Sequence, residues 1–419
     1  METIAVEHPH AATLSWVGDV LRGESSGTGK GGPPESLHDQ FVPFPNALQP
    51  RLLIPRGSRR GASRSVLEFT DATSVRVRLE RGALSAAIRT GALEAVLDRN
   101  TAKTRRRQRA LHIPLALEEH VGDIFGARGA RFSVSLGPPR ANIKPVLRVF
   151  DKDGRTLGYV KIGWNPLTKD LVEHEAEVLG KLQHRGHVNF KVPGLIHSGP
   201  WRDLELLAVS AVPPGRHFGG KPGRTLPLAA TQEVARLGPI TVETLGSSSY
   251  WIELKKRASA QREASSSSQA RTVLPNVIEY IEERYGHRPL SFGTWHGDWV
   301  PWNMRHLGDS LYVWDWERSS DGVPLGLDAV HFEFQVDLWL RRKSPVKAMV
   351  DSVERSSETL PQIVQERGAE QLLATLSCIE MAIRMEQGAI ASVPVPGRTY
   401  FALEELFAAL RALGMGAAL

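Results

Sequence analysis

Two short segments in the second half of the chain carry polar side chains at fixed spacings beside apolar residues. The first, residues 296–303, reads His-Gly-Asp-Trp-Val-Pro-Trp-Asn, so Asp298 and Asn303 stand five residues apart. In the second, the β-favouring run Leu-Tyr-Val-Trp at 311–314 ends directly at Asp315. One carboxylate can orient and deprotonate a hydroxyl, while an amide oxygen and a second carboxylate can hold Mg²⁺ against phosphates. This chemistry requires a fold in which the two segments are neighbours.

Segment 296–303 also has a purely structural interpretation. Gly297 and Pro301 punctuate it, and Asp and Asn are frequent turn formers, so a surface turn is the alternative. The second segment favours the functional interpretation, because a strand that delivers a carboxylate at its end is what a metal site needs. Glu317 follows two residues later and is predicted to contact the metal ligands rather than the metal itself.

The spacing His-x-Asp-x-x-x-x-Asn fits the catalytic loop of kinases. The stretch HGDWVPWNM, followed by VWDWERSSDGVPLGLD, resembles the aminoglycoside phosphotransferase and choline kinase superfamily, which has a protein-kinase-like fold. This resemblance implies catalytic-base duty for Asp298 and metal ligation by Asn303 and Asp315. It also implies that Asp328 begins the next helix and braces the catalytic loop, and that His296 is structural.

A kinase also needs a strand lysine on the nucleotide phosphates. Alternating residues predict three strands, at 131–137, 146–150 and 157–162. Asp-Lys-Asp-Gly at 151–154 predicts a hairpin turn between the second and the third. Lys161 on the third strand is the predicted phosphate lysine, and an ordinary exposed strand lysine is the alternative. Tyr159 lies on the same face at period two and could stack on adenine.

The glutamate that holds this lysine is expected on a helix at about 168–183, which contains three candidates. Glu175 shares its helix face with apolar residues three, four and seven positions away, so it is predicted to point inward. Glu173 and Glu177 fall on the opposite, solvated face. Glu175 is therefore the predicted partner of Lys161.

The adenine site is expected where the small lobe ends. Residues 204–212 form an apolar run closed by Pro-Pro-Gly, which predicts the last strand before the hinge. Backbone groups near Ser210 and Val212 would bind adenine. The loop at 137–143, expected to cover the phosphates, holds one Gly and two Pro instead of a Gly-rich pattern. Arg140, or the backbone amide that follows it, is its candidate phosphate contact.

Composition is that of a globular protein, with 41% hydrophobic and 23% charged residues. A single cysteine, Cys378, allows no intramolecular disulfide and suits a reducing, cytoplasmic location, and burial in a helix is expected for it. No secretory signal and no apolar run of membrane-spanning length is visible, so no membrane association is expected. The formal charge is +6 and the basic run at 103–109 lacks aromatic neighbours, which predicts a solvated segment rather than a nucleic-acid site.

The expected fold class is α+β: a bilobal protein-kinase-like fold with a small β-rich lobe, a large helical lobe and an N-terminal α/β extension. The predicted domains are a flexible N-terminal segment at 1–39, an extension packing on the small lobe at 40–125, the N-lobe at 126–213 and a helical C-lobe with the acceptor pocket at 214–419. Within the extension we expect strands at 50–55 and 74–79 and helices at 83–98 and 115–125. Helices are also expected at 328–342, 345–356, 368–387 and 399–413.

The resemblance implies an ATP- and Mg²⁺-dependent enzyme that moves the γ-phosphoryl group to a hydroxyl of a small molecule such as an antibiotic or a sugar. Only twelve residues separate Asp315 from Asp328, too few for a long activation segment with a peptide platform. Two alternatives stay open at this stage. One is a choline-type kinase, for which Trp299, Trp302, Trp316 and Trp339 are candidates for an aromatic cage. The other is a catalytically silent nucleotide-binding relative. The sequence leaves the acceptor, the choice between ATP and GTP, and the oligomeric state open.

Overall fold

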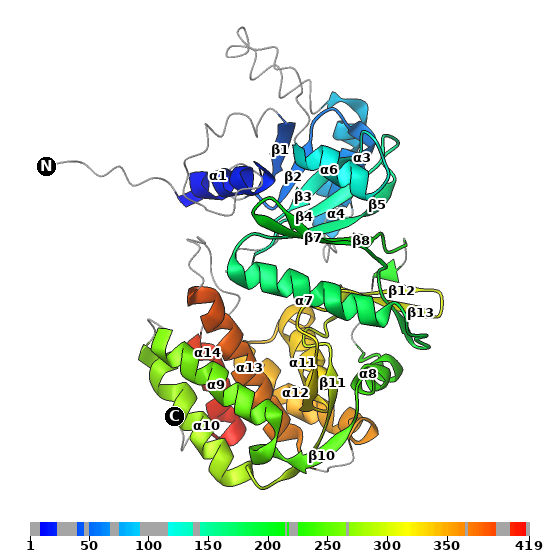
Figure 1. Cartoon of the computed structure of the whole chain (residues 1–419). Helices are drawn as coiled ribbons and strands as arrows, with labels where there is room; N and C mark the ends of the chain where they lie inside the picture. The colour runs from blue at the N-terminus through cyan, green and yellow to red at the C-terminus, as the bar shows by residue number, and fades with distance from the viewer. Residues whose placement is uncertain are drawn as a thin grey trace, which may run out of the picture. The chain divides into compact units, whose positions relative to one another are not determined.

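The computed structural model of the chain describes residues 9–22, 40–45, 50–67, 75–92, 116–136, 143–213, 216–217, 225–264, 268–364, 368–390 and 403–415. The chain divides into two compact units, one made of residues 1–183, 193–213 and 394–397 and the other of 184–192, 214–393 and 398–419. The first unit holds a large antiparallel sheet, and the second is mostly helical (Figure 1). These contents confirm the predicted α+β, protein-kinase-like fold class.

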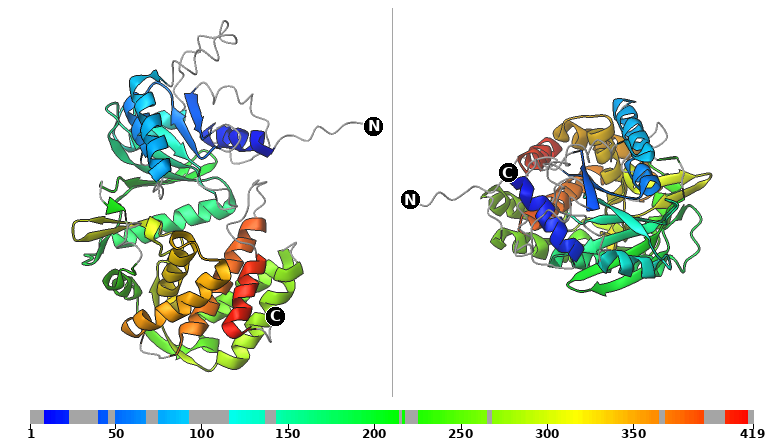
Figure 2. Two further views of the ribbon diagram at one scale, coloured as in Figure 1. Left: turned by 180° about the vertical axis from the view of Figure 1, so that it is seen from behind. Right: turned by 90° about the horizontal axis from the view of Figure 1, so that it is seen from above.

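The first unit is built on a seven-stranded antiparallel sheet with the order β1-β2-β3-β4-β5-β8-β7 (Figures 1 and 2). The strands are β1 (Phe41–Phe44), β2 (Leu52–Pro55), β3 (Arg131–Ser135), β4 (Val146–Phe150), β5 (Thr156–Gly163), β7 (Leu195–Trp201) and β8 (Leu204–Ser210). All three strands predicted around the phosphate lysine are present, as β3, β4 and β5. The apolar run predicted as the last strand is β8.

The predicted hairpin between β4 and β5 fixes which side chains of β5 share a face. Gly154 adopts φ +78°, and its backbone N–H donates to the Asp151 carbonyl at 2.9 Å. The turn sets Lys161 opposite Val146 in the ladder. Along β5, Tyr159 and Lys161 are half-buried while the residues between and beside them are buried, so the two side chains lie on one face as predicted.

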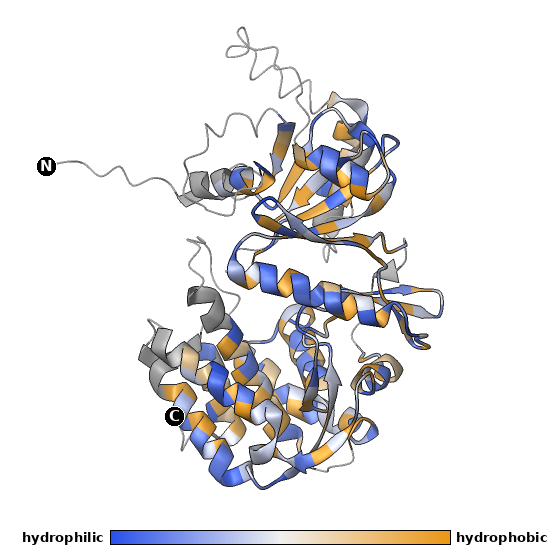
Figure 3. Cartoon of the chain, in the orientation of Figure 1, coloured by the Kyte–Doolittle hydropathy of each residue, from blue (hydrophilic) through white to orange (hydrophobic). Residues whose placement is uncertain are grey.

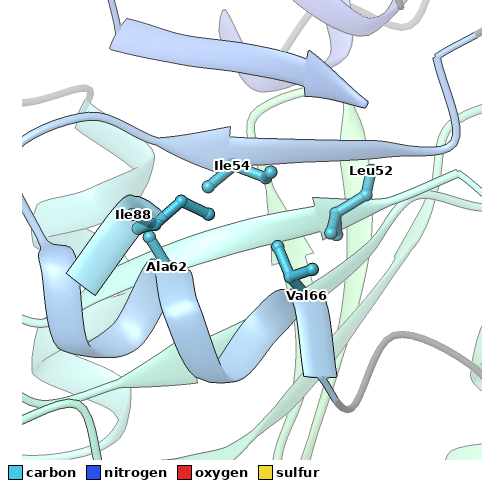
Figure 4. Packing of buried hydrophobic residues seen from close by; sticks show 5 residues of the cluster. All are labelled: Leu52, Ile54, Ala62, Val66 and Ile88. Carbon is cyan, nitrogen blue, oxygen red and sulfur yellow. The ribbon is translucent and has the colours of Figure 1, made fainter. Parts of the chain in front are cut away.

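The N-terminal extension adds two strands to this sheet and packs helices against them. Its helices are α3 (Arg59–Leu67), α4 (Val75–Thr90) and α6 (Ala116–Ile124), while α1 (Pro9–Arg22) precedes it, within residues 1–39. Leu52, Ile54, Ala62, Val66 and Ile88 form a buried cluster in which β2, α3 and α4 meet (Figure 4). The extension is thus joined to the sheet by both backbone pairing and an apolar core.

The strand predicted at 74–79 is wrong, because residues from Val75 onward belong to α4. Apolar and charged residues alternate over 75–79, but the apolar residues that matter for packing come later. Leu84 and Ile88 stand four residues apart and pack into the buried cluster, whereas Leu79 is 69% exposed. Tertiary burial at helical spacing therefore prevails over the local alternation. The helix predicted at 83–98 is the second half of α4, and positions after 92 lie outside the described residues.

Helix α7 (Pro166–Leu182) completes the first unit and packs against β5, β7 and β8. Its start is well specified, because Asn165 and Thr168 form a capping box and Pro166 occupies the first turn. Hydrophilic and hydrophobic residues alternate along the helix in Figure 3, and Glu175 is on the buried side. The capping residues fix the start of the helix, and Glu175 lies on the face that its buried apolar neighbours turn toward the sheet.

The second unit combines two small sheets with a group of helices. Its sheets have the orders β10-β11-β14 and β6-β13-β12-β9. Their strands are β6 (Phe190–Lys191), β9 (Arg216–His217), β10 (Thr241–Thr244), β11 (Pro289–Trp295), β12 (Met304–Leu307), β13 (Ser310–Val313) and β14 (Ser320–Pro324). The helices are α8 (Leu228–Ala235), α9 (Ser249–Ala264), α10 (Ser268–Tyr285), α11 (Leu327–Gln335), α12 (Pro345–Thr359), α13 (Glu370–Ile390) and α14 (Leu403–Leu410).

The helices predicted after Asp328 are present as α11 to α14, and α13 and α14 lie side by side. A π-helical turn, Val336–Leu340, follows α11 without a break. Cys378 is fully buried on α13, as expected, and burial raises the pKa of its thiol, which fits a packing role. In the described part of the chain, no helix combines the length and the apolar character needed to cross a bilayer.

Candidate active site

The loop 296–303 connects β11 to β12 and is held at its start by Asp328. Helix α11 begins after Gly326, which has φ +95°, and this places Asp328 in the first helical turn. Its carboxylate is buried and accepts hydrogen bonds from the backbone N–H of His296 at 2.7 Å and of Gly297 at 3.0 Å. Two backbone donors inside the unit are thereby satisfied by one side chain. The structure shows the bracing contact that the resemblance implied for Asp328.

Position 297 requires glycine for two physical reasons. Gly297 has φ +79°, which L side chains rarely adopt, and an added Cβ would lie 2.4 Å from the carbonyl oxygen of Arg318. The loop therefore makes a tight bend directly against the segment that follows Asp315. This bend brings the two sequence motifs into contact.

Asp298 and Asn303 face each other across a short turn. Residues Pro301–Asn303 form a single 3₁₀ turn, which closes the loop so that Asn303 Nδ2 donates to Asp298 Oδ2 at 2.9 Å and to the Asp298 carbonyl at 3.1 Å. Because the amide nitrogen of Asn303 is engaged with Asp298, its Oδ1 is the end left to act as a metal ligand. The two residues thus share one turn but present different atoms.

Asp315 is brought beside this turn by the β12–β13 hairpin. Met304 pairs with Val313, and the backbone N–H of Trp314 donates to the Asn303 carbonyl at 3.1 Å. Asp315 is the next residue, and it has φ +72°, a left-handed conformation that is uncommon for a residue with a side chain. The strand therefore ends in a bend at the carboxylate. Glu317, two residues on, is buried.

His296 lies between these groups and is fully buried. The backbone N–H of Asp298 donates to its Nδ1 at 3.2 Å, which leaves the proton on Nε2 to face the Trp314 carbonyl at 3.2 Å. Burial lowers the pKa of His296, and the charges of Asp328, Asp298 and Asp315 only partly oppose this effect. A neutral imidazole thus links the loop 296–303 to the residue that follows β13, which fits the structural role expected for it.

Two side chains next to Asp298 were missed by sequence reasoning. His331 on α11 places Nε2 3.5 Å from Asp298 Oδ1, and Arg384 on α13 donates from Nη1 to the Gly297 carbonyl at 2.7 Å. Burial alone would raise the pKa of Asp298, but His331, His296 and Arg384 outweigh burial and lower it. Asp298 is therefore ionised at neutral pH. No sequence motif indicates these two residues, because only tertiary packing brings their helices to the loop.

The predicted lysine and glutamate lie together in the first unit. Lys161 Nζ on β5 donates to both carboxylate oxygens of Glu175 on α7, at 2.7 and 2.5 Å. The side chains are 12% and 3% exposed, so the pair is largely shielded from water. Glu173 and Glu177 are exposed, as helical spacing predicted. A strand lysine held by a buried helix carboxylate is the pairing that kinases use to position nucleotide phosphates.

The residues predicted to bind adenine, Ser210 and Val212, differ in whether their polar groups already make hydrogen bonds within the protein. The backbone N–H of Ser210 already donates to the Gly194 carbonyl at 2.8 Å, and its Oγ accepts from the Gly194 N–H at 2.9 Å. Within the described part of the chain Val212 makes no hydrogen bond, so its backbone groups are the ones left for a ligand. Tyr159 lies on the face of Lys161. The phosphate-loop candidate Arg140 lies outside the described residues.

The donor set of the second unit fits Mg²⁺. The amide oxygen of Asn303 and the carboxylate of Asp315 are hard oxygen ligands, and Mg²⁺ is usually bound by one or two such groups together with waters and substrate phosphates. Asn303 is buried and orientated by its own hydrogen bonds, so its oxygen is pre-positioned rather than free to rotate.

Comparison with known proteins gives similarity only at the level of structure. No family model and no curated protein matches the chain. Among solved structures, the chain is similar to a thermostable mutant of aminoglycoside phosphotransferase APH(4)-Ia in ternary complex with AMP-PNP and hygromycin B, with 12% identity, a TM-score of 0.48 and coverage of 73% of this chain and 100% of that one. A glucosamine kinase in complex with glucosamine, ADP and inorganic phosphate is similar at 12% identity and a TM-score of 0.34, covering 68% of this chain and 91% of that one.

Proposed function

We propose that the chain is a phosphotransferase that uses ATP and Mg²⁺ to phosphorylate a hydroxyl group of a small molecule. The observation that carries this proposal is the arrangement of Asp298, Asn303 and Asp315 in one braced loop-and-hairpin unit. An ionised carboxylate faces an amide that holds it in place, and a second carboxylate follows at the adjoining strand end. The buried pair of Lys161 and Glu175 supports the same function from the first unit.

In the proposed reaction, Asp298 orients the acceptor hydroxyl and takes its proton. The hydroxyl oxygen forms the new bond to the γ-phosphorus, the bond from that phosphorus to the bridging oxygen breaks, and ADP leaves. Asn303 and Asp315 would hold Mg²⁺, which neutralises charge on the phosphates when bound. Lys161, fixed by Glu175, would position the phosphates. Positioning and charge neutralisation account for most of the catalysis.

A small-molecule acceptor is favoured over a protein acceptor by the short connection between Asp315 and Asp328. Residues Ser320–Pro324 of this connection form β14, which pairs with β11 inside the second unit. Five of the twelve residues are thereby committed to the loop's own sheet, and the rest are too few for a peptide-binding platform. We accordingly propose no switching by phosphorylation of this segment.

A choline-type acceptor receives less support from the tryptophans. Trp299 and Trp316 are fully buried, and their ring nitrogens donate to Thr231 Oγ1 and to the Val313 carbonyl. Both pack around His296. Trp302 and Trp339, each 38% exposed, are the remaining candidates for a cage around a quaternary ammonium group. The tryptophans that flank the motif therefore serve mainly as packing.

The direct test is ATP consumption by the purified chain over a panel of aminoglycosides, macrolides, sugars and amino alcohols, with Mg²⁺ and with chelator. We expect acceptor-dependent release of ADP that chelation abolishes, and a phosphorylated acceptor with a mass increase of one phosphoryl group. Binding of MgATP without consumption over the whole panel would instead support the catalytically silent alternative. Robust phosphate transfer to a generic protein substrate would contradict the small-molecule assignment.

Substituting the strand-end carboxylate tests the metal site. Asp315→Asn keeps the size of the side chain but removes a charged Mg²⁺ ligand, so kcat should fall by about 10²–10³-fold, as for loss of one electrostatic contact to the transition state. The Mg²⁺ concentration needed for half-maximal rate should rise. Both are measured by titrating Mg²⁺ at saturating ATP.

Asp309→Asn is the matched control, because Asp309 lies exposed in the turn between the same two strands. This variant should keep wild-type kcat and wild-type Mg²⁺ dependence. If Asp315→Asn behaved like Asp309→Asn, Asp315 would not be a metal ligand.

A further inference from the structure

The peptide group between Gly297 and Asp298 is held from both sides. Its carbonyl oxygen accepts a hydrogen bond from Arg384 Nη1 at 2.7 Å, and its N–H donates to His296 Nδ1 at 3.2 Å. The peptide group is planar, so fixing its oxygen and its nitrogen fixes the direction in which the chain enters the Cα of Asp298. The orientation of the Asp298 side chain therefore depends on the donor at its preceding carbonyl.

Arg384 is itself held in place by contacts along and beside α13. Its guanidinium carbon lies 5.0 Å from the centroid of the Trp295 ring, on the strand that leads into the loop. One helical turn earlier, Glu380 is 2% exposed and forms a two-pronged ion pair with Arg257 of α9, at 2.7 and 2.9 Å. Burial lowers the pKa of Arg384, and the charge of Glu380 partly opposes this effect. Charged side chains therefore connect α9 to α13 through Arg257 and Glu380, and α13 to the loop 296–303 through Arg384.

The contact is also chemically stronger than an ordinary turn hydrogen bond. A guanidinium is charged, and hydrogen bonds with a charged donor are roughly twice as strong as neutral ones. The loop has a left-handed glycine at the same peptide, Gly297, which makes it free to adopt other conformations unless something holds it. Asp328 holds the N–H side of Gly297, and Arg384 holds its carbonyl side.

We propose that Arg384 is a positioning residue for phosphoryl transfer, which fixes the Gly297–Asp298 peptide and so aims the Asp298 carboxylate at the acceptor hydroxyl. The inference rests on the proposed function for its effect on catalysis, but the loop-fixing itself does not depend on that function. Arg384 acts through the loop and is not assigned a contact with ATP. Its loss should therefore change kcat and leave the KM for MgATP unchanged.

The test compares Arg384→Met with Arg384→Lys. Methionine keeps much of the apolar length but donates no hydrogen bond, and kcat should fall by about 10–100-fold because the catalytic group loses its alignment. Lysine can still donate a charged hydrogen bond to the Gly297 carbonyl and should recover a substantial part of that loss. Thermal unfolding and MgATP binding, measured alongside, show whether each variant is folded.

Arg236→Met is the matched control. Arg236 is exposed on the second unit and donates Nη1 to a backbone carbonyl, that of Gln232, at 3.1 Å, so it makes the same kind of contact away from the loop. This variant should keep wild-type kcat. An Arg384→Met enzyme with wild-type kcat, or with a loss confined to the KM for MgATP, would overturn the proposal.

A second measurement separates this inference from the proposed function. Hydrogen exchange of the backbone amides at 297–299 should be at least about tenfold faster in Arg384→Met than in the wild-type chain, because the loop opens more readily when its carbonyl anchor is gone. This readout needs no acceptor and no turnover. Unchanged exchange would refute the positioning role even if the chain proved to be an active kinase. Faster exchange in a chain without any kinase activity would refute the function and keep the loop contact.

Discussion

Asp298→Asn should lower kcat for phosphoryl transfer by about 10²–10⁴-fold, the range that a positioned general base contributes. Asparagine keeps the shape of the side chain, and its oxygen can still accept the hydrogen bond from Asn303, so the loop should stay folded. What it loses is the negative charge that attracts and accepts the hydroxyl proton. The measurement is steady-state turnover with the best acceptor from the panel, together with MgATP affinity from direct binding.

MgATP affinity should stay close to that of the wild type, because Asp298 is assigned to the acceptor and not to the nucleotide. Asp309→Asn serves again as the control, since it makes the same chemical change on the exposed turn between β12 and β13. Wild-type turnover in a purified Asp298→Asn or Asp298→Ala variant would mean that the base has been assigned to the wrong residue.

Replacing Lys161 should produce the second large effect, on both stability and ATP use. Lys161→Met removes the charged group that pairs at 2.5 Å with the carboxylate of Glu175, which is 2% exposed. Breaking a buried ion pair by removing one partner typically costs about 3–5 kcal/mol. The KM for ATP should rise and kcat should fall as well, because the phosphates lose their positioning charge. Denaturant unfolding and steady-state kinetics measure the two effects.

A double substitution separates stability from catalysis at this pair. Lys161→Met combined with Glu175→Gln removes both charges, so much of the lost stability should return while activity stays low. Lys181→Met is the control, because Lys181 lies on the exposed side of α7. If the double variant regained activity together with stability, Lys161 would be a structural residue and not a phosphate ligand.

The sequence predicted the parts of the site that depend on local spacing. Helical periodicity selected Glu175 over Glu173 and Glu177, and the structure shows Glu175 buried against Lys161 while the other two are exposed. The β-run predicted before Asp315 is the strand β13, which ends at Val313, and Asp315 follows two residues later. Such patterns are reliable because burial acts on every turn or every second residue in succession.

What the sequence did not predict depends on packing between distant segments. His331 and Arg384 reach Asp298 and Gly297 from α11 and α13, across separations of 33 and 87 residues in the chain. Neither residue belongs to a recognisable spacing, and an isolated His or Arg on a helix is most often a surface residue. The strand wrongly expected at 74–79 has the same cause, since the burial of Leu84 and Ile88 outweighs the local alternation.

The left-handed backbone at Asp315 sets stability against activity when this residue is substituted. A residue with a side chain pays about 1–2 kcal/mol for such a conformation, whereas glycine adopts it freely. Asp315→Gly should therefore relax the backbone at the end of β13 while deleting the carboxylate proposed to bind the metal. Selection for thermal robustness and selection for turnover would act in opposite directions at this one position, and an engineered gain in melting temperature there would come with a silenced enzyme.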